Sequence, residues 1–268
     1  MAEFVAMATI HGIEATSDEL RALALTGYGH FTSMHVEEGG VRGFDLHLER
    51  LVSNAKAVFD ADLDRELLVA DIRAAIAGTT GNYTLRVTMF DPAINLGNVG
   101  TVTAKPVPLI TTRASHVGAL PPMQVKTVAF QRDTPEVKHV GLFSPLHHRV
   151  AAKRAGFGDV LFNDPTSTNI SEGNTWNIGF IAADGTVVWP DAAVLPGVTM
   201  ALLRGANDRY VAQAIPFAEI GRMQAAFATN ASIGVRPISA IDGHHFNPDH
   251  PAVASLQRAY ATIPAQRI

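Results

Sequence analysis

Two stretches decide the fold: Thr134-Pro135-Glu136-Val137-Lys138 and Ser171-Glu172-Gly173-Asn174-Thr175-Trp176-Asn177. The first offers an amine, Lys138, between a Pro-Glu turn and an apolar segment. The second offers a carboxylate, Glu172, at a glycine turn that leads into a strand. Taken singly, Lys138 reads as a surface lysine and Glu172 as a turn residue, because both residue types are mostly exposed. We interpret the pair as the two ends of one cofactor site.

The composition is that of a globular protein. The chain has 268 residues, of which 47% are hydrophobic and 17% charged, enough for one large domain or two modest ones. A net charge of −4 gives no reason to expect nucleic acid or an anionic membrane as a partner. With no cysteine, disulfides, thiolate zinc sites and a cysteine nucleophile are excluded. Without a long apolar run or a basic N-terminal region, we expect a cytoplasmic protein with no membrane-spanning helix.

The first part of the chain mixes strand and helix patterns. Alternation predicts strands and 3.6-residue spacing predicts helices. Asp45 is the expected cap of the helix over 45–55. Arg86 shares one face of its strand with Thr84 and Thr88. The expected elements are strands at 3–10, 28–36, 41–44, 83–90 and 106–111, and helices from residue 17, at 45–55 and at 65–77.

A linker is expected at residues 113–122, where Gly118 and Pro121-Pro122 interrupt any periodicity. We therefore predict an α+β protein with two domains, a smaller one over 1–112 and a larger one over 123–268. The elements expected in the larger domain are strands at 123–130, 159–163, 178–182, 187–189 and on both sides of a turn within 227–238, and helices at 142–156, 200–210 and 251–262.

The chemistry of a pyridoxal phosphate site matches these pieces. A lysine forms a Schiff base with the aldehyde, and an acid opposite the ring nitrogen keeps the ring protonated as an electron sink. A helix that begins behind a glycine turn binds phosphate through its backbone N–H groups. Two turns fit that description: Pro196-Gly197-Val198-Thr199, which precedes a helix, and Thr229-Asn230-Ala231-Ser232, whose small residues permit close approach.

In order, these pieces resemble the class IV aminotransferases, the fold-type IV pyridoxal-phosphate enzymes that include branched-chain and D-amino-acid aminotransferases and aminodeoxychorismate lyase. The resemblance rests on Tyr28-Gly29-His30-Phe31-Thr32, His47-Leu48-Glu49-Arg50-Leu51, Lys138, Ser171 to Phe180, Leu195 to Thr199, and Asn230-Ala231-Ser232. It implies that Lys138 is the catalytic Schiff-base lysine. It further implies that the cofactor pyridoxal 5'-phosphate is bound by Arg50, Lys138, Glu172, Asn177, Val198, Thr199, Asn230, Ala231 and Ser232.

Several positions depart from the family pattern. Met200 follows the Pro-Gly-x-Thr turn where the family usually has arginine. Phe143 stands where branched-chain aminotransferases have a tyrosine that bonds the cofactor's ring hydroxyl. The early strand often ends in Phe-Glu and here ends in Phe31-Thr32. Asn230-Ala231 is more similar to the lyase. These departures leave the cofactor in place and the reaction open.

Substrate contacts are expected from Arg86, His30 and Phe143. A strand arginine at this place in the family reaches the substrate carboxylate, and a bidentate guanidinium suits that task. The alternatives are an exposed strand arginine and ordinary sheet histidines. We predict no metal site, because the adjacent pairs His147-His148 and His244-His245 point apart on a helix or strand.

The resemblance implies an aminotransferase that moves an amino group between an amino acid and a 2-oxo acid. It also implies a homodimer with the cofactor between the two domains. Two alternatives stay open. One is a lyase of the aminodeoxychorismate type, in which the same proton abstraction leads to β-elimination and pyruvate release. The other is a non-catalytic dimeric scaffold that keeps the fold.

Overall fold

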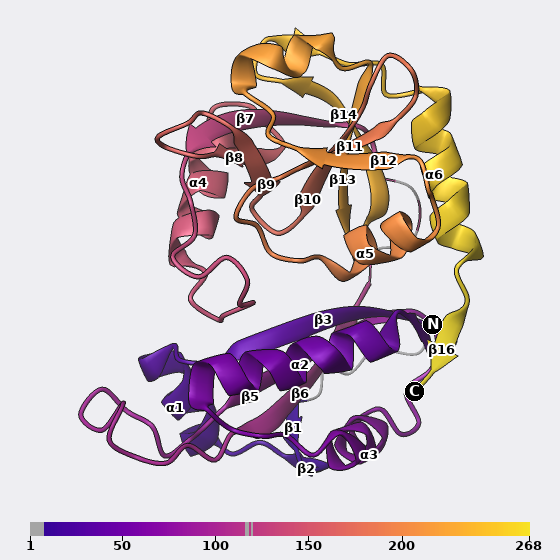
Figure 1. Cartoon of the computed structure of the whole chain (residues 1–268). Coiled ribbons are helices and arrows are strands. Elements are labelled where there is room, and N and C mark those ends of the chain that lie inside the picture. Colours follow the sequence, from indigo (N-terminus) through magenta and orange to yellow (C-terminus); the bar gives the residue numbers. More distant parts are fainter. Residues whose placement is uncertain (1–7, 116–117, 119) are drawn as a thin grey trace. The chain divides into compact units, whose positions relative to one another are not determined.

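The computed structural model describes residues 8–115, 118 and 120–268. The chain divides into two compact units (Figure 1). Unit 1 comprises Met1–Val117, Val137–Gly141 and Pro264–Ile268, and unit 2 comprises Gly118–Glu136 and Leu142–Ile263. Each unit combines a sheet with helices, so the predicted α+β class is confirmed.

Unit 1 is built on a sheet whose described strands run in the order β16-β4-β3-β5-β6-β1-β2. Its strands are β1 (Ala8–Ile10), β2 (Ile13–Glu14), β3 (His30–Glu37), β4 (Gly40–Arg42), β5 (Tyr83–Phe90), β6 (Val107–Ala114) and β16 (Ala265–Arg267). Its helices are α1 (Ser17–Thr26), α2 (Phe44–Phe59) and α3 (Arg65–Ala75). All the strand pairs of this sheet are antiparallel.

The two faces of the unit 1 sheet differ in polarity. One face is apolar: Met34 and Leu85 pack with Leu48 and Leu51 of α2, which lies along the sheet (Figure 1). The other face is polar around Arg86 of β5, which pairs with Ser33 of β3 and Thr111 of β6, and apolar where Phe90 and Leu109 pack. The alternation that predicted the strands therefore also separates a core face from a face suited to ligands.

Unit 2 is built on a larger sheet. Its strands are β7 (Met123–Ala129), β8 (Asp159–Asn163), β9 (Ile170–Gly173), β10 (Asn177–Ile181), β11 (Val187–Pro190), β12 (Tyr210–Gln213), β13 (Ala225–Asn230), β14 (Gly234–Ile241) and β15 (His244–His245). Its helices are α4 (Phe143–Arg154), α5 (Val198–Gly205), the short 3-10 helix η1 (Phe217–Arg222) and α6 (Pro251–Thr262). Among the described residues, every helix of the chain is too short or too polar to cross a lipid bilayer.

The core of unit 2 lies on both sides of β10 and β13. Ile178 and Phe180 belong to one buried cluster, whereas Ile181 and Phe227 belong to another that includes residues of α5 and α6. Gly179 is the Cα partner of Phe227 across these two strands. A Cβ at Gly179 would lie 2.3 Å from the Phe227 ring, so only glycine lets that ring approach β10 this closely.

In unit 1, the starts of α1 and α3 follow local signals, whereas the start of α2 does not. Thr16 caps α1 and forms a reciprocal capping box with Glu19, and Asp64 caps α3. The prediction that Asp45 caps the next helix is wrong. Gly43 is the N-cap of α2, in the left-handed conformation with φ 70°, and Asp45 lies inside the first turn, where it pairs with Arg65. Glycine takes positive φ without steric cost, so α2 begins earlier than its apolar pattern indicates.

Two short segments join unit 1 from far along the chain. The linker predicted at 113–122 overlaps the last two residues of β6 and ends just before β7, and its residues 116, 117 and 119 lie outside the described part. Val137–Gly141 belongs to unit 1, because the Phe31 N–H donates to the Lys138 carbonyl at 2.8 Å and the Val140 N–H donates to the Gly29 carbonyl at 2.9 Å. The C-terminal β16 pairs with β4. No local pattern in either segment indicates these partners.

The other predicted elements form near the expected residues, with ends that differ by up to about one helical turn. Two further points stand out. Of the strand expected at 3–10, residues 3–7 lie outside the described part, and the remainder is β1. The helix expected at 200–210 ends at Gly205, and β12 begins at Tyr210. Strand β12 pairs in parallel with β11, with Val187 opposite Tyr210, so tertiary pairing overrides the local helical pattern there.

We predict that Gly179→Ala destabilises the protein by about 1–3 kcal/mol, because the new methyl group overpacks against the Phe227 ring. Urea unfolding, followed by intrinsic fluorescence, measures the change. Gly205→Ala is the matched control: nothing lies within 4 Å of a Cβ at this helical position, so its stability is unchanged or slightly higher. Equal stability of Gly179→Ala and the native protein would contradict this description of the core.

Candidate cofactor-binding site

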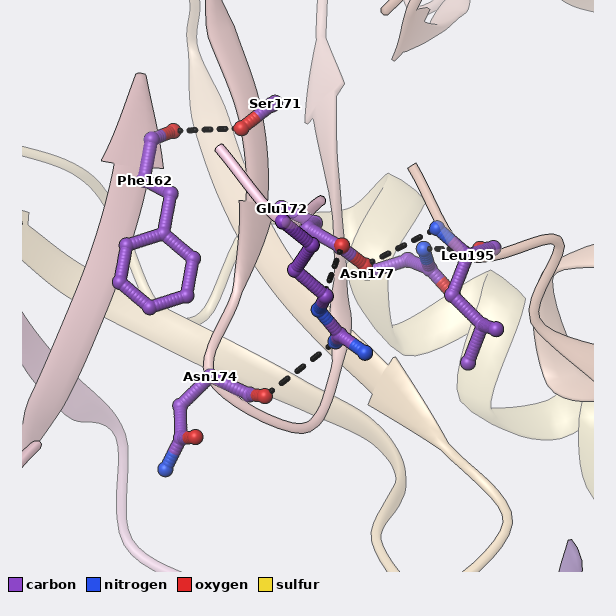
Figure 2. Close-up of polar contacts among 7 residues, drawn as sticks. Phe162, Ser171, Glu172, Asn174, Asn177 and Leu195 are labelled. Atoms are coloured by element: carbon purple, nitrogen blue, oxygen red, sulfur yellow. Dashed lines mark hydrogen bonds and ion pairs between the residues drawn. The ribbon is translucent and has the colours of Figure 1, made fainter. Parts of the chain in front are cut away.

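Glu172 lies at the centre of the site in unit 2 and is held at both carboxylate oxygens. Arg132 Nε lies 3.1 Å from Glu172 Oε1, and the backbone N–H of Leu195 donates to Glu172 Oε2 at 3.2 Å. Figure 2 shows Glu172 directed toward Leu195. The side chains of Glu172 and Arg132 are only 4% and 6% exposed. The carboxylate is therefore a fixed, buried acceptor and not a mobile turn residue.

Asn177 connects Glu172 to the first phosphate-type turn. Asn177 pairs with Glu172 across the β9–β10 hairpin, and its side-chain amide donates to the Leu195 carbonyl at 2.8 Å (Figure 2). The next residues approach closely, because a Cβ at Gly197 would lie 2.0 Å from Asn177 Oδ1. Leu195 thus forms one bond with each end of the hairpin, which fixes the chain that enters α5.

The spacing between Glu172 and Asn177 depends on the bulky residue between them. The Trp176 ring covers Gly173, where a Cβ would lie 2.0 Å from ring atoms. The Trp176 indole N–H donates to buried Asp159 at 3.2 Å, and the Gly173 N–H donates to the Trp176 carbonyl at 2.8 Å. A small residue at 173 and an anchored ring at 176 therefore hold this hairpin in one shape.

The N-terminus of α5 has features that suit an anion. Its N-cap, Gly197, makes no side-chain capping hydrogen bond, and the first backbone N–H groups of a helix have no partner within the helix. Thr199 is 1% exposed, and its hydroxyl has no hydrogen-bond partner among the described residues. A buried hydroxyl without a partner is costly. Thr199 and the backbone at Val198 therefore fit the phosphate group that the sequence predicted here.

The departure at Met200 has a packing explanation. Met200 is 7% exposed and belongs to the buried cluster that contains Trp189 and Leu203. An arginine at this position would place a charge among apolar side chains.

The second turn, residues 230–232, is closed by the Asn230 side chain. Asn230 Oδ1 accepts the backbone N–H groups of Ser232 and Ile233, both at 2.9 Å. Its amide donates to the Thr175 carbonyl at 3.0 Å, which links this turn to the hairpin that carries Glu172. Asn230 thus has a structural role, and the N–H groups of Ser232 and Ile233 are committed to the turn.

Lys138 belongs to unit 1 and is fixed through its backbone. Its N–H donates to the Asn54 side chain of α2 at 3.0 Å, and its carbonyl accepts the Phe31 N–H of β3. Its Nζ lies 5.0 Å from the centre of the Phe31 ring, a distance compatible with a cation–π contact. Helix α2 and strand β3 therefore fix the backbone position from which the Lys138 side chain extends.

Arg50 belongs to the same unit, on α2. Burial lowers the pKa of Arg50 to about 10, so it stays charged at neutral pH. His47 lies one turn earlier on α2, and its Nδ1 contacts the Thr32 hydroxyl at 2.6 Å. Burial, together with the charges of Arg50 and Lys138, lowers the pKa of His47 to about 3. His47 is therefore neutral, and the two cations that affect its pKa are Arg50 and Lys138. These are the residues predicted to bind the phosphate and the aldehyde of the cofactor.

Arg86 is positioned on the polar face of the unit 1 sheet. Its guanidinium carbon lies 3.7 Å from the centre of the Phe31 ring, and its Nε donates to Thr88 at 3.1 Å. Burial, with a smaller effect from the nearby Arg113, lowers the pKa of Arg86. The Phe31 ring thus contacts both Arg86 and Lys138. The residue predicted to bind the substrate carboxylate therefore lies near the predicted Schiff-base lysine.

The other two predicted substrate contacts gain no support from their surroundings. His30 is completely buried, with its ring 5.9 Å from that of Phe59. Phe143 is the first residue of α4 and is 79% exposed. Their roles toward a substrate stay predictions, as do the cofactor roles of the residues described above.

Two residues that hold the site together were not among the predicted site residues. Asn54 holds Lys138 and is a polar residue at the position i+3 from Leu51, on the buried stripe of α2. That exception to an apolar stripe was a usable signal. Arg132 holds Glu172, and nothing in its local sequence distinguishes it from a surface arginine.

Comparisons with known proteins identify the family and the fold of the chain. Residues 29–241 match the sequence model of the family described as amino-transferase class IV. No curated protein sequence matches the chain significantly. The fold is similar to solved structures of branched-chain amino acid aminotransferases.

Three solved structures illustrate the similarity. A branched-chain enzyme from Escherichia coli has TM-score 0.84, 16% identity and coverage of 97% of this chain and 95% of that one. A branched-chain enzyme from T.th. with pyridoxamine 5'-phosphate has TM-score 0.83, 17% identity and coverage of 97% and 94%. A hypothetical aminotransferase from Mycobacterium tuberculosis in its apo form has TM-score 0.80, 17% identity and coverage of 96% and 98%.

We predict that His30 makes the protein sensitive to acid. Burial lowers its pKa from 6.5 to about 4, so the folded state keeps His30 neutral while the unfolded state takes up a proton below pH 6.5. Stability is therefore lost as the pH falls from 6.5 toward 4. In His30→Leu this loss is smaller by roughly 2–3 kcal/mol, at about 1.4 kcal/mol per pKa unit.

Urea unfolding of both proteins across this pH range measures the difference. The comparison at pH 8 gives the packing cost of the substitution, and the slope below pH 6.5 gives the contribution of the titration. Identical slopes in the two proteins would contradict the buried, neutral state of His30.

Proposed function

The chain belongs to the class IV aminotransferases, and we propose that it moves an amino group between an amino acid and a 2-oxo acid with pyridoxal 5'-phosphate as its cofactor. The observation that carries the proposal is the fixed, buried carboxylate of Glu172. The same unit contains a helix start without a side-chain cap, where the Thr199 hydroxyl has no partner in the described part of the chain. One of the branched-chain structures contains pyridoxamine 5'-phosphate, which is the aminated form of this cofactor.

The cofactor, when bound, supplies an aldehyde that reacts with amines and a ring that withdraws electrons from the substrate α-carbon. In this proposal Glu172 holds the ring nitrogen in its protonated form, since a fixed carboxylate accepts a charge-assisted hydrogen bond. Arg50, Val198 and Thr199 bind the phosphate and fix the orientation of the ring. The turn at 230–232 contributes the Ser232 hydroxyl, because its Ser232 N–H is already bound to Asn230.

Lys138 has two roles in the proposal. Its Nζ holds the cofactor before the substrate arrives, and afterwards acts as the general base that removes the proton from the substrate α-carbon. Asn54 and Phe31 limit the positions that this amine can take, because they bind the Lys138 backbone. Arg86, supported by Phe31 and Thr88, binds the substrate carboxylate.

We further propose that the protein is a homodimer. Helix α4 has exposed apolar side chains that suit a protein interface, namely Phe143, Leu146 and Val150.

We predict that Lys138 is the residue to which the cofactor attaches. The native protein, mixed with pyridoxal 5'-phosphate and reduced with borohydride, should carry a stable cofactor label on the peptide that contains Lys138. Lys138→Ala should lose the label, and Lys126→Ala, which removes an exposed lysine of β7, should keep it. Peptide mass spectrometry locates the label. A labelled Lys138→Ala protein would refute the lysine assignment.

The reaction type is tested by a half-reaction without an acceptor. An aminotransferase should convert its bound cofactor to the pyridoxamine form with one of the common L- or D-amino acids, and release one 2-oxo acid per subunit. Absorbance spectra and quantification of the oxo acid follow the conversion. Repeated release of pyruvate without an acceptor would instead identify a lyase, and a native protein that binds no cofactor would identify a scaffold.

A further inference from the structure

We propose that Arg132 is a positioning residue for the cofactor: it holds the Glu172 carboxylate in the orientation in which Glu172 contacts the ring nitrogen. This inference rests on the proposed function, because it concerns how Glu172 performs the role assigned to it. Arg132 lies outside every motif that suggested the site. It reaches Glu172 from the segment between β7 and Lys138, which is 172 − 132 = 40 residues away in sequence.

The geometry shows a clamp on the carboxylate. Arg132 Nε lies 3.1 Å from Oε1 of Glu172, and the Leu195 N–H binds Oε2 at 3.2 Å. Arg132 and Leu195 therefore contact different oxygens of the carboxylate, and together they limit its rotation. A carboxylate has about four lone-pair directions, so Glu172 can accept more donors than the two named here.

The clamp is itself fixed by its surroundings. Arg132 Nη2 donates to the Asn174 carbonyl at 3.4 Å, which ties the guanidinium to the hairpin that carries Glu172. Figure 2 shows Asn174 on the loop that follows Glu172. The Leu195 backbone is bound in turn by Asn177. Arg132 therefore contacts the hairpin at two points and has little freedom to leave Glu172.

Stability alone is a weak reason for this pair. Arg132 is 7% exposed and Glu172 is 3% exposed, so both charges have lost most of their hydration. The attraction within a buried ion pair often only offsets that loss, and apolar replacements of such pairs are often neutral or stabilising. A pair that contributes little net stability, yet orients a predicted cofactor contact, is better explained by positioning.

The alternative is a purely structural ion pair, and a double-mutant cycle separates the two. The variants are Arg132→Met, Glu172→Gln and the combination of both, with Arg132→Lys as the variant that keeps the charge. Arg209→Met is the matched control, because Arg209 pairs with Asp184 in the same unit but both side chains are more than half exposed. Three measurements apply to each variant: urea unfolding without cofactor, the dissociation constant of pyridoxal 5'-phosphate, and the absorbance spectrum of the bound cofactor across pH.

We expect Arg132→Met to weaken cofactor binding about tenfold, by analogy with residues that orient metal ligands, and to reproduce the spectral change that Glu172→Gln causes. In the Glu172→Gln background, Arg132→Met should cause no further change in affinity or spectrum, since Arg132 acts through Glu172. Arg132→Lys should largely restore both properties. Arg209→Met should leave them at native values.

Urea unfolding without cofactor shows whether a variant binds the cofactor weakly only because it is less well folded. Arg132→Met leaves a buried carboxylate without its cation and is expected to be less stable, whereas the double variant recovers stability. A native-like affinity and spectrum in Arg132→Met would overturn the inference, as would equal losses in both Glu172 backgrounds. Failure of the native protein to bind the cofactor would instead overturn the proposed function, so the two failures are distinguishable.

Discussion

The backbone of Leu195 is the point on which the site in unit 2 depends. Its N–H binds Glu172 and its carbonyl binds Asn177, so both ends of the β9–β10 hairpin attach to the chain that starts α5. The residue that presents a carboxylate and the helix that presents N–H groups are therefore held in one rigid arrangement. The glycines follow from this constraint, because Gly173 lies under the Trp176 ring and Gly197 against the Asn177 side chain.

In unit 1, Lys138 is held in place through its backbone. Lys138 lies on an irregular segment, and its backbone is held by β3 on one side and by Asn54 of α2 on the other. The same helix carries Arg50, four residues before Asn54 and thus on the same face. One helix therefore determines the positions of a predicted phosphate-binding charge and a predicted catalytic amine. The neutral His47 on this helix adds no third charge to this crowded region.

Local patterns predicted the elements better than their partners. The alternation over Tyr83–Phe90 and the apolar stripe of α2 are properties of short segments, and both elements formed where expected. The pairing of β16 with β4 joins opposite ends of the chain and has no local signature. The N-cap of α2 was misplaced because the left-handed Gly43 precedes the helical pattern. Within the site, Asn54 could have been noticed as a polar residue on the apolar stripe of α2. Arg132 interrupts no such pattern, so its role could not be predicted from the sequence.

The cofactor side and the substrate side of such a site differ in how much a sequence reveals. In unit 2, the predicted cofactor contacts depend on close backbone approaches, which demand glycine and asparagine at set spacings, and the fold that holds them persists at 16–17% identity to the solved relatives. In unit 1, the predicted substrate contacts come from side chains around Arg86, such as Ser33. The backbone of a sheet tolerates many residue types at such positions, so the sequence there is less constrained. For this reason the motifs of this chain predict a cofactor and do not predict a substrate.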